Sequence, residues 1–138
     1  MKSIIALVVI LVSTLAFGSF VAGLGGLGLS YGITAGITSD DFAFFGYSGP
    51  ASLFAVIGTG VGIFADFTPF ELFAGTLSEK EYRILLGGGA GISLDLFVIP
   101  DLGLGVTIKT IWGKFITKAT TGFGLMGLYA DAVVGYTF

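Results

Sequence analysis

Large apolar residues and small residues alternate with a period of two along much of the chain. From Gly26 to Ile37, leucine, isoleucine, tyrosine and alanine take the odd positions, and glycine, serine and threonine take the even positions. Successive side chains of a β-strand point to opposite faces, so this pattern predicts a strand with one bulky apolar face and one small face. A 3.6-residue helical period would scatter the glycines around the helix surface, which disfavours a helix here.

Turn signals divide the alternating pattern into eight predicted strands. These strands are Gly26–Ile37, Phe42–Tyr47, Leu53–Asp66, Phe70–Leu77, Tyr82–Val98, Leu102–Trp112, Phe115–Leu125 and Gly127–Phe138. The signals between them are Ser39–Asp41, Gly49–Pro50, Thr68–Pro69, Ser78–Glu81, Pro100–Asp101 and Gly113–Lys114. If residues 38–52 form one loop and Phe115–Leu125 is not a separate strand, six strands remain. Six is below the usual minimum of eight for a membrane barrel, and would indicate strands contributed by several subunits of a homo-oligomer.

The composition indicates that the apolar face meets lipid. Hydrophobic residues make up 54% of the 138 residues, and charged residues only 11%, against roughly 25% charged in ordinary soluble domains. The mean hydropathy is +1.00. A soluble domain of this size has a large surface for its volume and needs more polar side chains than this to cover it. The sequence therefore predicts an all-β fold, an antiparallel up-and-down transmembrane β-barrel of eight strands or, as the alternative, six.

The last eleven residues, Leu128 to Phe138, show the clearest alternation. One face is wholly apolar and ends in Tyr136 and Phe138, whereas the other face carries Tyr129 and Asp131. This stretch resembles the closing strand of bacterial outer-membrane β-barrels, which commonly ends in Phe after apolar or aromatic residues at alternate positions. The resemblance implies an outer-membrane location, and it implies that the assembly machinery of that membrane reads Tyr136 and Phe138 as its signal. An ordinary edge strand of a soluble sheet is the alternative.

The N-terminal residues 1–18 read as a secretory signal peptide. Lys2 supplies the positive charge, Ile4–Val12 is the apolar segment, and Ala16 and Gly18 are the small residues before a cleavage site. We expect cleavage after Gly18 and a mature barrel over residues 19–138. A retained transmembrane helix is the competing interpretation, because the uncharged run continues to Ser39.

Charged residues of the predicted strands fall on the face that carries the small residues. The expected lumenal charges are Asp66, Glu71, Arg83, Asp95, Lys109, Lys114, Lys118 and Asp131. They comprise four acids and four bases, and bare charges inside a narrow barrel are costly unless they are paired. We therefore expect an internal ion-pair network for which the glycines make room. A structural role for these pairs is favoured, and a polar pathway for ions or small solutes is the alternative.

Several function classes are disfavoured by the sequence. The chain has no Cys and no His, so disulfides, thiolate or imidazole metal ligands, and Cys or His catalysis are excluded. Gly87–Gly89 is not followed by the Lys-Ser/Thr of a phosphate loop, and the net charge of −3 gives no basic surface for nucleic acid. We expect no enzyme activity, no cofactor, no bound metal and no nucleic-acid partner. The expected partners are the lipid bilayer and the assembly machinery.

Three functional hypotheses remain at this point. The first is an outer-membrane barrel with a structural, surface or narrow-channel role. The second is a small polytopic inner-membrane protein with helices over residues 3–29, 50–65 and 84–100, although segments of about 16 residues are short of the roughly 20 that a membrane helix needs. The third is a secreted β-rich protein that assembles into a surface layer or fibre.

Overall fold

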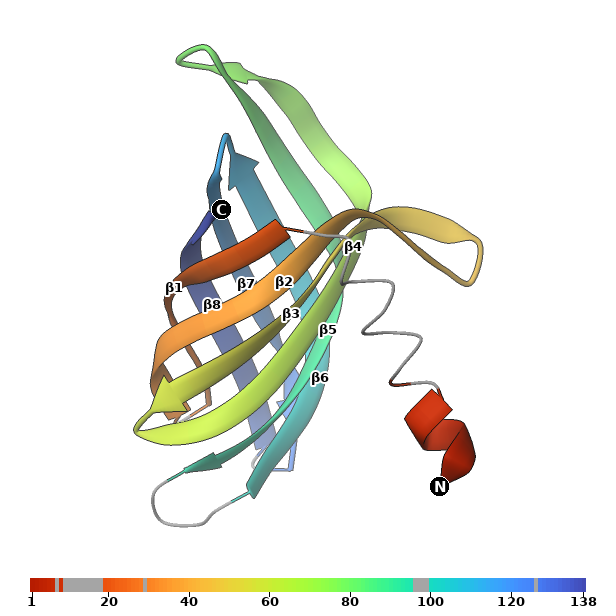
Figure 1. Cartoon of the computed structure of the whole chain (residues 1–138), viewed down its shortest axis with the longest axis vertical. Helices are drawn as coiled ribbons and strands as arrows, with labels where there is room; N and C mark the ends of the chain where they lie inside the picture. The colour runs from red at the N-terminus through yellow and green to blue at the C-terminus, as the bar shows by residue number, and fades with distance from the viewer. Residues whose placement is uncertain (7, 9–18, 29, 96–99, 126) are drawn as a thin grey trace.

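Eight antiparallel strands follow one another around a closed barrel (Figure 1). The computed structural model describes residues 1–6, 8, 19–28, 30–95, 100–125 and 127–138. The strands are β1 (Ser19–Leu27), β2 (Ser30–Phe44), β3 (Tyr47–Gly58), β4 (Gly60–Leu77), β5 (Lys80–Asp95), β6 (Pro100–Trp112), β7 (Phe115–Gly124) and β8 (Gly127–Thr137). Each strand pairs with the next, and pairing of β1 with β8 closes the ring. The predicted all-β, eight-stranded, up-and-down topology is confirmed.

Two turns in the first half of the barrel were not predicted. The predicted strand Gly26–Ile37 covers the end of β1 and the start of β2, which are joined through Gly28 in a left-handed backbone conformation. The turn pairs Leu27 with Ser30, so odd residues point inward in β1 and outward in β2. Leu27, which we predicted to face outward, is instead completely buried.

The predicted strand Leu53–Asp66 also covers two strands, β3 and β4. A three-residue connection centred on Thr59 joins them, and Ile57 pairs with Val61. Because the connection has an odd number of residues, the odd-numbered positions face outward both before and after it. The alternating pattern therefore continues unbroken through the turn and gives no sign of it. The predicted turns at Ser39–Asp41, Gly49–Pro50 and Thr68–Pro69 are wrong, since these residues lie inside β2, β3 and β4. The pairing shifts register near the first and the last of them.

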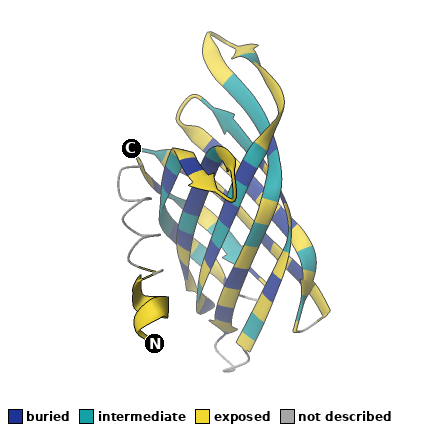
Figure 2. Cartoon of the chain, turned by 90° about the vertical axis from the view of Figure 1, so that its right-hand side faces the viewer, coloured by how far each residue is buried: buried dark blue, intermediate teal, exposed yellow. Residues whose placement is uncertain are grey.

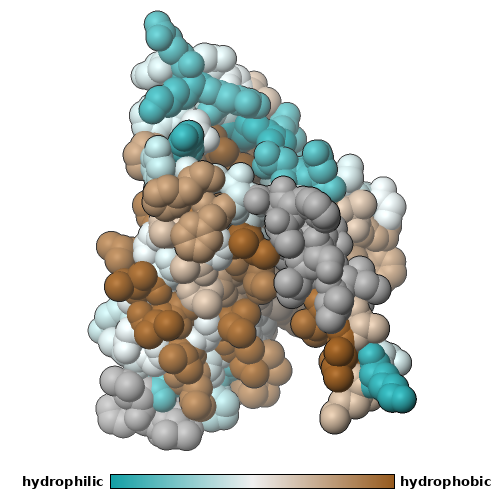
Figure 3. Space-filling model, in the orientation of Figure 1, coloured by the Kyte–Doolittle hydropathy of each residue, from teal (hydrophilic) through white to brown (hydrophobic). Residues whose placement is uncertain are grey.

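Buried and more exposed residues alternate along the strands within the closed ring (Figure 2), whereas most residues of the β4–β5 extension are exposed. In β8, Tyr129, Asp131 and Val133 are buried, whereas Leu128 and Val134 are exposed. Every strand contributes large exposed apolar side chains to the outer wall; one from each strand in order is Leu24, Ile33, Ile57, Ile63, Ile92, Val106, Phe123 and Val134. Hydrophobic residues gather on the barrel wall and hydrophilic residues at the β4–β5 hairpin (Figure 3).

Two hairpins extend past the closed part of the barrel and diverge from each other (Figure 1). Pairing between β3 and β4 stops at Ala51 and Phe67, although both strands continue. The next residues include Pro50 and Pro69, which have no N–H to donate to a ladder. The hydroxyl of Thr68 donates a hydrogen bond to the Pro50 carbonyl at 3.2 Å and takes the place of the missing backbone contact.

Both long hairpins lie at the end of the barrel where β1 begins and β8 ends. Residues 45–46, 78–79 and 113–114 make the turns at this end, and the opposite end has the short connections from β1 to β2 and from β3 to β4. Residues 2–6 are helical. Within the described ranges, no helix combines the length and the apolar character needed to cross a bilayer. Segments 50–65 and 84–95, weighed above as membrane helices, are strands.

Candidate functional site

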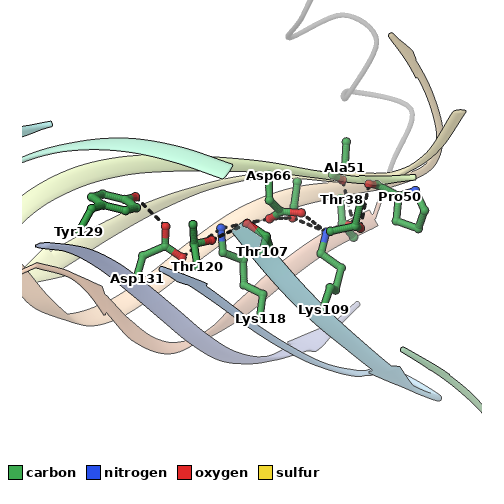
Figure 4. Close-up of polar contacts among 12 residues, drawn as sticks. Thr38, Pro50, Ala51, Asp66, Thr107, Lys109, Lys118, Thr120, Tyr129 and Asp131 are labelled. Atoms are coloured by element: carbon green, nitrogen blue, oxygen red, sulfur yellow. Dashed lines mark hydrogen bonds and ion pairs between the residues drawn. The ribbon is translucent and has the colours of Figure 1, made fainter. Parts of the chain in front are cut away.

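Four charged side chains from four strands meet inside the barrel (Figure 4). Asp66 on β4 forms ion pairs with Lys109 on β6 and with Lys118 on β7, the latter at 3.2 Å between Nζ and Oδ2. Lys118 also lies 3.3 Å from Oδ1 of Asp131 on β8. The four residues occupy the inward positions of their strands, so the strand period and the register bring them together. They form one chain of alternating charge, Lys109–Asp66–Lys118–Asp131.

Hydroxyl groups extend this ion network at both ends. Ser52 receives a hydrogen bond from Lys109 Nζ at 2.8 Å and donates one to Asp66 at 2.5 Å. At the other end, the Tyr129 hydroxyl donates to Asp131 at 2.6 Å. The network therefore runs from β3 around the interior to β8.

All four charged side chains of the network are fully shielded from solvent, at 0% exposure. Two acids balance two bases, so the interior holds no net charge at this level. The Lys118 ammonium also lies 4.6 Å from the ring centroid of Phe64 and 5.8 Å from that of Phe54, an arrangement that favours the cation. Buried charges are tolerated when they are paired and hydrogen-bonded in this way.

Tyr129 fills the interior next to the network. Its ring and hydroxyl occupy a slot between Gly91 on β5 and Gly103 on β6, where a Cβ atom on either glycine would overlap the tyrosine. The hydroxyls of Thr107 on β6 and Thr120 on β7, which are paired residues of neighbouring strands, share a hydrogen bond of 2.6 Å. An eight-stranded barrel is just wide enough for side chains to fill, and these groups occupy that space.

The other predicted lumenal charges lie outside this ion network; of them, Asp95 is on the inward face of β5 together with Gly91 and Ser93. Glu71 and Arg83 form a 2.8 Å ion pair on the β4–β5 extension, partly exposed. Asp95 is buried at the last position of β5, and Lys114 is exposed at the β6–β7 turn. The structure thus brings four of the predicted residues into one network and distributes the others along the barrel.

Sequence reasoning did not assign site roles to the uncharged members of the network. Ser52 and Tyr129 are both buried and both bond to a charged member. The sequence did carry a signal for Tyr129. It lies two residues before Asp131 in the same strand, so both side chains point to the inward face. Ser52 lay outside every predicted strand, so the sequence did not indicate which face of the sheet its side chain would occupy.

A cavity of about 430 Å³ opens at the end of the barrel where β1 begins. Its lining residues are Ser19, Thr38, Ser39, Asp40, Asp41, Ile111, Gly113, Lys114, Ile116 and Thr137. The described residues contain no group of three or more acidic, His or Cys side chains able to hold a metal ion. Most of the residues that line this mouth cavity are polar.

An aromatic row crosses the outer wall at the same end. Phe20 on β1 lies 6.0 Å from Phe138, Phe138 lies 5.3 Å from Tyr136, Tyr136 lies 5.4 Å from Phe115, and Phe115 lies 6.2 Å from Trp112, all between ring centroids. The row spans four adjacent strands, from β1 across the closing seam to β6. Such girdles mark the membrane–water boundary of transmembrane barrels.

Two lysines accompany this aromatic row. The Lys80 ammonium lies 5.4 Å from the Trp112 ring, and the Lys114 ammonium lies 6.0 Å from the Tyr136 ring. Long cationic side chains beside interfacial aromatics can keep their charge in water while their stems cover apolar surface.

Searches with family models, among curated proteins and among solved structures find no match to this chain. Its function is therefore inferred from its own geometry: a closed ring, an apolar wall, an aromatic rim and an interior filled by a neutral ion network.

Proposed function

We propose that this chain is an integral β-barrel protein of the bacterial outer membrane, with a closed interior and a structural or surface role. The observation that carries this proposal is the apolar outer wall, to which all eight strands contribute exposed side chains such as Leu24, Ile57 and Val106. A barrel in lipid leaves no unpaired strand edge around its ring, which satisfies the requirement that backbone polar groups be paired inside the bilayer. The partner of this wall is the lipid bilayer.

The aromatic row supports the same proposal. It lies at one rim, next to the lysines at positions 80 and 114, and the most polar run of the chain, Ser78–Glu81, forms the hairpin end beyond it. An apolar wall, then an aromatic rim, then charged residues is the order expected from hydrocarbon through the interface to water.

Tyr136 and Phe138 fit the role of an assembly signal. Their side chains are 37% and 70% exposed, so both are available for recognition. The Phe138 N–H donates to the Phe20 carbonyl at 2.7 Å, which puts this segment on the seam where β8 meets β1. We propose that the outer-membrane assembly machinery binds this segment before the seam closes.

The filled interior favours a structural role over transport. Tyr129 and the Asp66–Lys118–Asp131 contacts lie next to one another inside the barrel, so a narrow channel would need these groups to move. We propose no catalytic role: Asp66 and Asp131 bond to lysine and hydroxyl partners, and the chain has no Cys or His.

The proposal can be tested with a charge placed on the outer wall. Val106 is the central residue of β6 and is 55% exposed, so Val106→Arg should destabilise the barrel in phospholipid vesicles by about 2–4 kcal/mol. The matched control is Thr76→Arg, which puts the same charge on the exposed β4–β5 extension. Folding is followed by the mobility of unheated and boiled samples on denaturing gels, with circular dichroism.

Membrane insertion predicts a heat-dependent mobility shift, a strand-type spectrum, and a loss for Val106→Arg that Thr76→Arg does not show. Equal behaviour of the two variants would contradict a lipid-facing wall. A mature chain that stays soluble without detergent would favour the secreted β-rich alternative.

A further inference from the structure

The β2–β3 extension leaves the barrel sideways. In Figure 1 this hairpin turns away from the barrel axis, and in Figure 2, seen from that side, it points toward the viewer. The pairing of β2 with β3 shifts register between Ser39 and Phe42, and irregularities of this kind bend a strand pair. Beyond Ala51, β3 no longer pairs with β4. The hairpin therefore projects outward from the ring instead of closing over the lumen.

The two faces of this hairpin differ in chemistry. Phe44 pairs with Tyr47, and Ala43 pairs with Ser48. Directly paired residues share a face of the ladder, whereas neighbours along a strand alternate between faces. One face therefore carries aromatic side chains (Phe42, Phe44 and Tyr47), and the opposite face carries small and polar ones (Asp41, Ala43 and Ser48). The polar face belongs to the side of the mouth cavity, which Asp41 helps to line.

The aromatic face is continuous with the outer wall of the barrel. The Phe42 ring lies 5.5 Å from that of Phe67, and the Tyr47 ring lies 5.5 Å from that of Phe70, both between centroids. Ala51 occupies an outward position of β3 but is only 4% exposed, because Phe42 packs against it on the outside of the sheet. The hairpin thus extends the apolar wall sideways instead of beginning a separate surface.

An apolar groove lies between this hairpin and β5. One hollow of about 380 Å³ is lined by the aromatic rings and by the small residues Ala65, Gly88 and Ala90 of the outer wall. A second hollow of about 470 Å³ shares Phe44, Phe67 and Gly88 with the first, so the two form one groove along the outside of the barrel. Gly88 contributes no side chain and leaves its floor open.

The tip of the hairpin combines exposure with backbone strain. Phe45 is 87% exposed, and its φ of 50° lies in the left-handed region, as does that of Gly46. Two consecutive residues of this kind form a tight hairpin turn whose first position favours Asn, Asp or Gly, and a bulky residue there is an outlier. The Phe45 ring packs edge-on against Phe44, 4.4 Å between centroids, and covers no part of the barrel interior. An apolar environment outside the chain gives this arrangement a physical reason.

We propose that the β2–β3 hairpin is an interfacial arm, which lies along the bilayer surface with its aromatic face among the acyl chains and its polar face in water. Acyl chains of the same leaflet fill the groove beneath it. This rests on the proposed membrane barrel, because the occupant is chosen from continuity with the lipid-facing wall. Amphipathic helices at membrane surfaces bury one apolar face at the boundary of headgroups and acyl chains, and the two faces of this hairpin provide the same division.

The aromatic row at the same end of the barrel supports this placement. That row lies on β1, β8, β7 and β6, whereas the arm and the wall beneath it supply rings on β2, β3 and β4. Aromatic side chains are enriched where the hydrocarbon meets the headgroups. The arm thus continues the aromatic belt over the strands that the row leaves out.

The experiment places one tryptophan at three positions of the protein. Trp112→Phe removes the single natural tryptophan, and a new one is introduced by Phe45→Trp at the tip, by Ser48→Trp on the polar face, or by Val106→Trp on the barrel wall. Each protein is refolded into phosphatidylcholine vesicles with and without bromine atoms on the acyl chains. Bromine quenches the fluorescence of a tryptophan that touches the acyl chains, and iodide in the buffer quenches one that is open to water.

Brominated lipid should quench Phe45→Trp and Val106→Trp at least about two-fold more than Ser48→Trp, because only the aromatic face of the arm is buried at the interface. Iodide should give the reverse order for the two positions of the arm. If loss of Trp112 prevents folding, Phe45→Cys and Ser48→Cys in the otherwise natural chain carry a spin label instead. The label at the tip should then be more accessible to oxygen, which concentrates in lipid, and the label on the polar face to a nickel complex in water.

Equal access of iodide to Phe45→Trp and Ser48→Trp, with Val106→Trp quenched by brominated lipid, would overturn the arm and leave the membrane barrel standing. Shielding of Phe45→Trp from both quenchers would also overturn it, because the tip would then contact protein, such as a second copy of the chain. Absence of lipid quenching for Val106→Trp would contradict the membrane barrel itself. The wall position and the tip position are read separately, so the two failures are distinguishable.

Discussion

Asp66 is the residue on which the interior ion network depends most. It pairs with both Lys109 and Lys118 and accepts a hydrogen bond from Ser52. Asp66→Asn keeps the size of the side chain but removes its charge. Lys118 would keep Asp131 as its acid, whereas Lys109 would keep only the Ser52 hydroxyl. The substitution therefore leaves one ammonium buried without a carboxylate.

The expected loss is large because these side chains have no access to solvent. Breaking a buried pair by removing one partner costs about 3–5 kcal/mol, and every 1.4 kcal/mol is a factor of about ten. The equilibrium between folded and unfolded barrel should therefore shift by roughly a hundred-fold to several-thousand-fold. Glu71→Gln is the matched control, because the Glu71–Arg83 pair is partly exposed and should contribute about 0–1 kcal/mol.

The assay is reversible urea unfolding in phospholipid vesicles, followed by the gel mobility shift and by the fluorescence of Trp112, the single tryptophan. If Asp66→Asn does not fold, Asp66→Asn combined with Lys109→Met should restore folding, since the buried unpaired ammonium is gone. A single-variant loss no larger than that of Glu71→Gln would refute the idea that the network is a sealed, mutually dependent unit. Failure of the double variant to recover would refute the assignment of the loss to Lys109.

Two further substitutions test the slot occupied by Tyr129. Gly103→Ala would push a Cβ into the tyrosine ring and should cost about 1–3 kcal/mol by overpacking, whereas Gly88→Ala, whose added Cβ would meet only a carbonyl at 3.6 Å, should be tolerated; equal urea midpoints for the two would contradict the slot. Tyr129→Phe removes the donor to Asp131 and should cost about 1–3 kcal/mol, and an unchanged midpoint would show that Asp131 does not need it.

The sequence was sufficient for the fold class because the barrel imposes one simple constraint on every strand. Lipid outside and a narrow lumen inside require bulky and small residues to alternate, and this alternation is local information. The ends of the strands were harder to predict from the sequence. Tight connections such as Gly58–Gly60 preserve the alternation, and prolines such as Pro69 lie inside a strand at a bulge rather than in a turn.

The ion network illustrates a second limit. The two-residue alternation of each strand was enough to place Asp66, Lys109, Lys118 and Asp131 on the inward face. Which of the inward charges meet depends on their height along the barrel, and that height follows from the register of all eight strands. Because two turns in the first half of the chain were missed, the strand pairs there, and so the heights of their residues, could not be predicted. Glu71, which we also predicted to face inward, lies after a register shift in β4 and beyond the point where β3 and β4 stop pairing, so it pairs with Arg83 on the extension instead.

The position of the long hairpins refines the proposed role. With eight strands, both ends of the barrel sequence lie on one side of the membrane, which is the periplasmic side for an exported barrel. The β2–β3 and β4–β5 extensions lie at that same end (Figure 1), whereas the described connections at the opposite end, such as that from β3 to β4, are tight. For the barrel proposed above, the two long extensions would form a periplasmic contact surface, which fits a structural role.

Single cysteines can test this orientation, because the chain has none of its own. Leu125 is 69% exposed at the β7–β8 turn, and Thr76 is exposed on the β4–β5 extension. A membrane-impermeant maleimide applied to intact cells should label Leu125→Cys and leave Thr76→Cys unlabelled until the outer membrane is opened. Labelling of Thr76→Cys alone would reverse the orientation, and the two long hairpins would then be the outer surface through which the protein meets its surroundings.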